Sequence, residues 1–229
     1  MNIKKRILAI VPHPDDEVLG AGGILAKSKL LGYKTKVLTI GTNFVSPIIK
    51  KKLNDSLNEA KKAHKILKVD KSIFFNIPAL TVHKQPIEVL ANKIYEEIKN
   101  FEPSIVLIPF PDRHQDHKAV FDLSMTATRP KGVGKQISLV ACYEVPSSTY
   151  FSAPKIEPNF YPNWNVDISS TIKKKINALK QYKSTLSKNE FARSTKAINS
   201  LASFRGSQVG FDYAECFYII RMQSKNTLF

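Results

Sequence analysis

The sequence is poor in cysteine and lacks long apolar runs. Of its 229 residues, only Cys142 and Cys216 are cysteines, and neither belongs to a CxxC or CxxH pattern. A disulfide scaffold and a thiolate metal site are therefore excluded. No apolar run approaches the roughly 20 residues that span a bilayer, and residues 1–5 lead directly into a short apolar strand-like run rather than a secretory signal. We expect a cytoplasmic protein with no stable membrane insertion.

Acidic residues are also scarce relative to basic ones. The chain has 19 Asp and Glu against 35 Lys and Arg, which gives a net charge of +16. Such an excess suits an anionic partner. However, most of these residues are lysines, which lack the bidentate grip of arginine, and runs such as 173–175 are usually solvated helix faces. We expect no nucleic-acid partner and keep a basic binding module for an anionic polymer as an alternative to an enzyme.

Hydrophobic patterning through the first two thirds of the chain is typical of βαβ units. Short, β-branched runs bounded by Gly, Pro or Asn predict buried strands at 6–11, 36–41, 73–76, 105–109 and 137–145. Between them, apolar residues three or four positions apart predict helices that cover the sheet. With right-handed crossovers, the sequence predicts an α/β fold: a Rossmann-like three-layer α/β/α sandwich with a mostly parallel sheet.

The chain changes character after residue 145. Residues 146–162 are rich in Pro, Ser, Tyr and Phe and predict an ordered loop that lies over the core. Apolar spacing then predicts helices over 172–186 and 198–204, and 216–221 predicts a closing strand. We expect one domain over 1–229, in which a helical and strand extension, 146–229, packs on a Rossmann-like core, 1–145.

Two groups of His and acidic residues directly follow the first and fourth predicted strands, at 12–17 and 112–117. If the strand order is 3-2-1-4-5, these strands are neighbours at the switch point, and the two groups meet beyond their carboxyl ends. Imidazole and carboxylate ligands without thiolate suit a catalytic zinc with an open position for water. Capping of two unrelated helices explains one or two of the acids but not His13, which stands between two prolines.

Such a cluster has the parts for metal-assisted hydrolysis. A carboxylate outside the metal shell takes a proton from the bound water, and a histidine outside it stabilises the oxyanion or protonates the leaving group. Covalent catalysis has no candidate, because a G-x-S-x-G elbow is missing and neither cysteine has a nearby histidine.

At these residues the sequence resembles the GlcNAc-phosphatidylinositol de-N-acetylase (PIG-L, or LmbE-like) superfamily of zinc-dependent sugar deacetylases. The opening motif [AP]-H-P-D-D-E with a Gly-rich helix start matches 12–17 and 20–23, and H-x-D-H matches 114–117. The resemblance covers nearly the whole chain and implies a single deacetylase-like domain. It implies one Zn²⁺ per chain, bound by His13, Asp16 and His117.

The resemblance also implies catalytic roles. Asp15 is the general base, His114 polarises the carbonyl or acts as the acid, and Asp116 orients His114. A third family feature, G-x-x-Y-A-E-x-F, matches 210–217 and implies that Tyr213 lies near the substrate. A half-buried strand position for Tyr213 is the equal alternative.

One position departs from the family pattern. Many members carry R-x-x-E-A on the second helix, with the Arg facing the substrate pocket, and here Ser56 stands in its place. Arg113 is the nearest basic substitute for a substrate contact, and a salt bridge to Asp112 is its alternative role.

The implied reaction is hydrolysis of an N-acetyl group on a GlcNAc-type amino sugar or its conjugate, giving acetate and a free amine. The partner is then a small-molecule amino sugar, which is free, nucleotide-linked or lipid-linked. A metal-dependent amidase acting on a non-sugar amide is the nearer alternative, and the basic binding module the more distant one. We also expect a homo-oligomer.

Overall fold

The computed structural model describes residues 4–43, 47–153 and 155–224, with the backbone alone for residues 43 and 47–54. Seven strands form one sheet. Their bounds are β1 (Arg6–Val11), β2 (Lys34–Asn43), β3 (Lys71–Pro78), β4 (Ile105–Pro109), β5 (Leu139–Tyr143), β6 (Trp164–Asp167) and β7 (Ala214–Met222).

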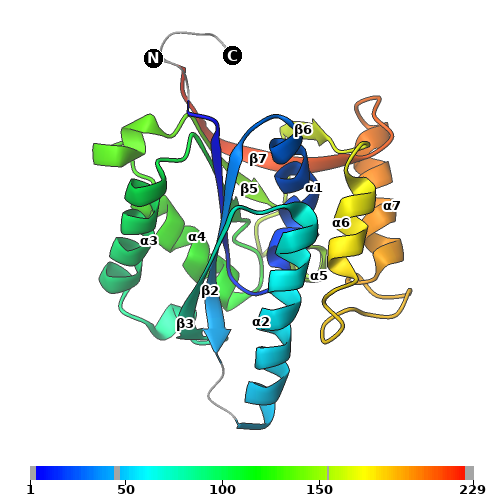
Figure 1. The fold of residues 1–229 in the computed structure, drawn as a ribbon, viewed down its shortest axis with the longest axis horizontal. Coiled ribbons are helices and arrows are strands. Elements are labelled where there is room, and N and C mark those ends of the chain that lie inside the picture. The colour runs from blue at the N-terminus through cyan, green and yellow to red at the C-terminus, as the bar shows by residue number, and fades with distance from the viewer. Residues whose placement is uncertain (1–3, 44–46, 154, 225–229) are drawn as a thin grey trace.

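The strand order across the sheet is β3-β2-β1-β4-β5-β7-β6 (Figure 1). Strands β1 to β5 are parallel to one another. The last two are antiparallel to their neighbours, β7 to β5 and β6 to β7. The order of the first five strands is the one expected, and it places β1 beside β4.

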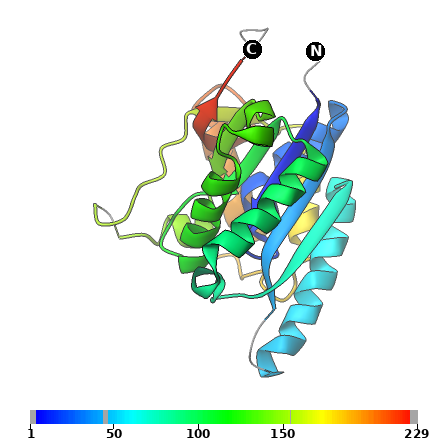
Figure 2. The same ribbon diagram turned by 90° about the vertical axis from the view of Figure 1, so that its left-hand side faces the viewer.

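Helices cover both faces of the sheet. On one face lie α3 (Ile87–Phe101) and α4 (Gln115–Ala127), as Figures 1 and 2 show. The other face carries α1 (Asp16–Leu30), α2 (Pro47–Leu67), α6 (Ile172–Leu179) and α7 (Thr195–Ser207). Short elements complete the list: α5 (Pro146–Thr149) and the 3₁₀ turns η1 (Val82–Lys84) and η2 (Gly132–Gln136). The predicted three-layer α/β fold is confirmed.

The central strands are apolar on both sides because both sides are covered. In β1, Ile7, Ala9 and Val11 pack into the core under α1 and α2, whereas Leu8 and Ile10 pack into the core under α3 and α4. All five are fully buried. This explains the unbroken apolar run of the sequence, since successive strand residues point to opposite faces.

The C-terminal part differs from the sequence expectation in four places. The helix expected over 172–186 ends at Leu179, because Tyr182 turns inward and its hydroxyl donates to Glu17. The loop expected from residue 146 begins with α5, and β6 was not anticipated. Lys175 is buried rather than solvated. Within the described ranges, no helix is long and apolar enough to cross a membrane.

Candidate active site

The loop from β1 to α1 brings three consecutive carboxylates into the first turn of a helix. Asp16 and Glu17 begin α1, and Asp15 is its N-cap residue. All three are buried, and none exposes more than 2% of its surface. The positive end of the helix dipole favours negative charge at this place. The acids that favour the start of α1 therefore also lie together just beyond the end of β1.

The loop from β4 to α4 supplies two histidines. His114 is the N-cap residue of α4, and His117 lies in the first turn, fully buried. Because β1 and β4 are hydrogen-bonded neighbours, the two loops meet. The ring centroid of His114 lies 4.8 Å from that of His13 and 4.7 Å from that of His117. The structure thus brings both sequence motifs together at the carboxyl ends of neighbouring strands.

Three of these side chains place ligand atoms around one point. Asp16 Oδ2 lies 3.3 Å from His13 Nδ1 and 3.5 Å from His117 Nε2. In a zinc tetrahedron the ligand atoms are about 3.3–3.4 Å apart, because zinc bonds nitrogen and oxygen at about 2.0–2.1 Å. Asp16 Oδ1 and His117 Nε2 are buried without a hydrogen-bond partner among the described residues. The three side chains therefore fit a divalent metal ion.

Two more carboxylates fix the orientation of the imidazoles. Asp112 Oδ2 lies 3.0 Å from His117 Nδ1, and Asp116 Oδ2 lies 2.8 Å from His13 Nε2. Each ring has one nitrogen on a carboxylate and the other near Asp16. Metal-binding histidines usually have this arrangement, because the carboxylate sets the ring orientation and makes the ligand more basic.

The role of Asp116 differs from the one expected. The sequence predicts that it orients His114, but its carboxylate contacts His13 instead. The backbone N–H groups of Leu80 and Val82 also donate to this carboxylate, at 2.5 and 3.1 Å, and hold it in that position. Asp116 contacts His114 through its backbone N–H, which donates to His114 Nδ1 at 3.1 Å.

The electrostatics of the cluster favour a cation. Burial by itself lowers the pKa of His117, but the carboxylates of Asp16 and Asp112 more than offset it and raise the pKa to about 10. Burial likewise opposes ionisation of Asp16, yet the imidazoles of His117 and His13 hold the pKa of its carboxyl well below the usual range. The buried acids thus draw positive charge to the point where their ligand atoms converge.

Asp15 has an unusual backbone and an unusual carboxyl group. Its φ of 104° and ψ of −28° lie where L residues rarely occur. Burial raises the pKa of its carboxyl to about 7; the Arg193 guanidinium opposes this rise, and the Asp16 carboxylate adds to it. Arg193 Nη1 lies 3.4 Å from Asp15 Oδ2. A buried carboxyl with a pKa near neutrality suits a general base.

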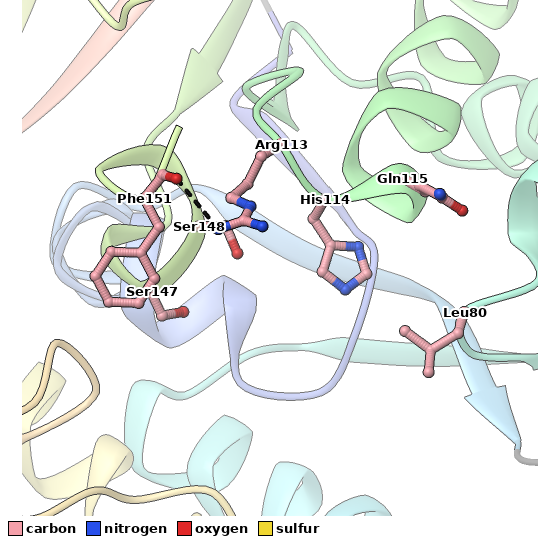
Figure 3. Close-up of a pocket in the computed structure, with 7 residues that line it drawn as sticks. All are labelled: Leu80, Arg113, His114, Gln115, Ser147, Ser148 and Phe151. Carbon is pink, nitrogen blue, oxygen red and sulfur yellow. Dashed lines mark hydrogen bonds between the residues drawn. The ribbon is translucent and has the colours of Figure 1, made fainter. Parts of the chain in front are cut away.

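A cavity of about 360 Å³ lies beside His114. In Figure 3, Leu80 and Phe151 lie on opposite sides of the His114 ring. Arg113 also lines the cavity, and its Nη1 donates to the backbone carbonyl of Phe151 at 3.2 Å. Arg113 therefore lies at the cavity, and its contact with a substrate stays a prediction. The complete lining is Leu80, Arg113, His114, Gln115, Ser147, Ser148 and Phe151.

Tyr213 lies apart from this cavity. It is half-buried and packs against Ile168, Ile172 and Ala202, and it is not among the residues that line the pocket. Tyr213 is half-buried, as the structural alternative expects, but it lies in the bend directly before β7 rather than within the strand. The neighbouring Glu215 explains the placement, because its carboxylate accepts hydrogen bonds from two backbone N–H groups of α1 and fixes this segment.

The sequence analysis placed Asp112 in the second group of His and acidic residues, but it did not anticipate the contact of Asp112 with His117. Arg193 was missed altogether, because no local pattern indicates that the tertiary fold brings it to Asp15. Ser56, the position at which the sequence departs from the family pattern that it resembles, is buried on α2.

Comparison with known proteins identifies the family. Residues 8–128, just over half of the chain, match the family model described as "PIG-L: GlcNAc-PI de-N-acetylase". The chain belongs to this family. The superfamily resemblance noted in the sequence is thereby confirmed, and the two PIG-L motifs are the two loops that meet at the cluster.

Relatives of this PIG-L chain are deacetylases. The uncharacterized deacetylase YaiS of Escherichia coli (strain K12) is 34% identical over 163 residues, covering 68% of this chain and 82% of that protein. The diacetylchitobiose deacetylase of Thermococcus kodakarensis is 26% identical over 227 residues, covering 93% and 82%. These relatives support an N-deacetylase enzyme.

The fold by itself does not set the reaction. The crystal structure of GalB, the 4-carboxy-2-hydroxymuconate hydratase of Pseudomonas putida KT2440, has a TM-score of 0.77 and 19% identity, with 98% of this chain and 99% of that chain covered. A hydratase therefore shares the architecture, so the reaction depends on the residues of the site rather than on the fold.

Proposed function

We propose that this PIG-L family chain is a zinc-dependent hydrolase that removes the N-acetyl group from an amino sugar and releases acetate and a free amine. The carrying observation is the convergence of Asp16 Oδ2 with imidazole nitrogens of His13 and His117, at 3.3 and 3.5 Å. A carboxylate behind each ring completes the arrangement. Nitrogen and oxygen ligands without thiolate suit catalytic Zn²⁺.

His13, Asp16 and His117 would hold the metal. A second grouping, in which His114 replaces Asp16, also has its ligand atoms within 4.8 Å of one another. In the first set, Asp16 Oδ2 lies within 3.5 Å of one nitrogen of each imidazole, and His114 already uses Nδ1 as the acceptor that caps α4. When bound, zinc supplies a Lewis acid that lowers the pKa of a water molecule toward about 7 and polarises a carbonyl group.

The other residues of the cluster would move the protons. Hydrolysis adds the oxygen of water to the acetamide carbon and breaks the carbon–nitrogen bond. Asp15 would accept the proton that water loses, and that proton would end on the departing amine. Asp112 and Asp116 would hold the imidazole rings of the ligands.

His114 would bind the carbonyl oxygen. Burial foremost, with the neighbouring rings of His13 and His117, lowers its pKa to about 4, so the ring is neutral at pH 7. Because Nδ1 accepts the Asp116 N–H, the proton of the neutral ring lies on Nε2. This N–H can donate to the oxyanion that forms during attack, which is the role of an oxyanion-hole residue.

The pocket suits a small polar molecule with apolar faces. Polar side chains such as Arg113 and Ser147 can bind hydroxyl groups, while Leu80 and Phe151 can pack on a sugar ring. The volume of about 360 Å³ lies at the lower end of the roughly 300–1,000 Å³ typical of small-molecule sites. Together with the diacetylchitobiose deacetylase relative, this favours a GlcNAc-type amino sugar, free or conjugated.

The first experiment measures the zinc-to-protein ratio of the purified chain and then amine release from N-acetylglucosamine and N,N′-diacetylchitobiose. We expect about one zinc per chain and metal-dependent amine release. His117→Ala should lose both. Asp15→Ala should keep its zinc but lose turnover by about 10²- to 10⁴-fold.

Asp122→Asn is the matched control, because Asp122 is an exposed carboxylate of α4, the helix that carries His117. It should keep both zinc and activity. A fully active His117→Ala protein without zinc would refute the ligand assignment. Absence of tightly bound metal even after zinc is added, combined with salt-dependent retention on a polyanion, would favour the binding module instead.

A further inference from the structure

Arg193 reaches the acid cluster from the far end of the chain. Its Nη1 lies 3.4 Å from Asp15 Oδ2, and its Nε donates a hydrogen bond to Ser147 Oγ at 2.8 Å. Ser147 belongs to α5 and lines the cavity beside His114. One guanidinium group therefore joins the buried carboxylate to the pocket wall through two different nitrogens.

The backbone around Arg193 is anchored. Its carbonyl accepts a hydrogen bond from the N–H of Ser187 at 3.3 Å. The next residue, Ser194, is the buried N-cap of α7, and its Oγ accepts the N–H of Ala197 at 3.0 Å. Arg193 thus lies in a turn directly before the N-cap residue of α7, and these hydrogen bonds hold the point from which its guanidinium extends.

The surroundings of Asp15 call for such a partner. Its carboxylate is buried and adjoins Asp16 in the chain, and Arg193 lies within ion-pair distance of its Oδ2 atom. The planar fork of arginine can hold an oxygen at a set angle, which the point charge of lysine cannot do. Arg113, the basic residue that the sequence indicates at this site, bonds to the Phe151 carbonyl instead.

We propose that Arg193 is the positioning residue of the general base. It holds Asp15 Oδ2, so that the other carboxylate oxygen accepts the proton of the attacking water, and it ties this geometry to Ser147 on the pocket wall. This role rests on the proposed hydrolase function. Arg193 touches no reacting atom, yet a displacement of about 1 Å in a catalytic group can cost about 100-fold in rate.

The test compares zinc-loaded Arg193→Ala and Arg193→Lys with wild-type protein, using the N-acetyl sugar that the wild type hydrolyses. Arg193→Ala should lower kcat about 10- to 100-fold while KM and zinc content stay near the wild-type values, and Tm should fall by a few degrees because the Asp15 carboxylate stays buried without its partner. Arg193→Lys should recover part of the loss. Guanidinium ion, added well below denaturing concentrations, should partly restore kcat in Arg193→Ala. Arg129→Ala, which removes an exposed arginine, is the control. Its kcat should equal that of the wild type and should not rise when guanidinium ion is added.

Each other outcome has a definite meaning. A kcat for Arg193→Ala within about twofold of the wild type would overturn the role of Arg193. A raised KM at unchanged kcat would assign it to substrate binding, and a loss of zinc or a larger fall of Tm, without guanidinium rescue of kcat, would make it structural; both overturn the proposal. Wild-type protein that releases no amine from any N-acetyl sugar would instead refute the proposed function, and the role of Arg193 with it.

Discussion

Asp15 concentrates strain and desolvation in one residue. Its φ of 104° places the side chain against its own backbone, which costs about 1–3 kcal/mol, and its carboxylate is only 2% exposed. A residue chosen for stability alone would avoid both costs. Such outliers persist where the surrounding structure requires the geometry, and they cluster at functional sites.

The backbone strain at Asp15 can be measured by substitution. The Asp15→Gly protein should have a free energy of unfolding about 1 kcal/mol higher than that of the Asp15→Ala protein, because glycine adopts positive φ without a Cβ clash. Urea unfolding measures the difference. At the exposed Asp122 inside α4 the order should reverse, with alanine about 1 kcal/mol better than glycine. The same order at both positions would contradict strain at Asp15.

At the scale of elements, α1 is the helix whose position decides the site. Its Gly-rich start permits close packing rather than phosphate binding. A Cβ at Gly20 would lie 2.2 Å from the Tyr143 ring of β5, and one at Gly23 would lie 2.7 Å from Ile168. A buried ion pair then fixes the middle of the helix. The pair consists of Glu215 and Lys175. The Glu215 carboxylate accepts hydrogen bonds from the backbone N–H groups of Gly23 and Ile24, and the Lys175 ammonium donates one to the Leu19 carbonyl.

Breaking this pair should be costly. Lys175 Nζ lies 2.6 Å from Glu215 Oε1, and both side chains are at most 4% exposed. Lys175→Ala would leave the Glu215 charge buried and should lower the free energy of unfolding by about 3–5 kcal/mol. Lys99→Ala is the control, because the pair of Lys99 with Glu96 is more than half exposed and contributes at most about 1 kcal/mol. Equal losses for the two variants in urea unfolding would contradict this account.

Elements with a strong local pattern were predictable, and those that depend on distant partners were not. β1 and β4 were found with the observed bounds because both faces of each are buried. β6 was missed because it has only four residues, Trp164–Asp167, too short an alternation to stand out from the loop before it; pairing with β7 makes it a strand. The helix beginning at Ile172 was predicted too long, because the bond of Tyr182 to Glu17 of α1 is invisible in the local sequence.

At the scale of the whole molecule, the net charge of +16 is the main global property. Buried lysines such as Lys36 and Lys175 are paired with acids, so the unbalanced charge lies at the surface. Self-repulsion of this charge disfavours the compact state. Salt screens it over a distance of about 8–10 Å at physiological ionic strength.

Stability should therefore rise with salt. We expect Tm to increase by a few degrees between about 20 and 300 mM NaCl, because repulsion among exposed lysines is screened. A triple variant of exposed lysines, Lys62→Glu, Lys93→Glu and Lys188→Glu, is the control. Each Lys→Glu change removes one positive charge and adds one negative charge, so the net charge falls from +16 to +10. The rise in Tm with salt should be smaller in this variant. A Tm that falls with salt in the wild type would mean that ion pairs outweigh the repulsion.

The sequence by itself determined the layered α/β fold and the two loops of the site. Hydrophobic periodicity and strand-end motifs are local features of the sequence. The carboxyl ends of parallel strands lie at one edge of the sheet, so the two loops meet when β1 and β4 are neighbours. Tertiary structure alone decided the partners of each side chain. The carboxylate of Asp116 contacts His13 rather than His114, Tyr213 does not line the pocket, and Arg193 lies against Asp15. These contacts join residues from distant segments, and side-chain direction after a turn depends on packing that no local pattern encodes.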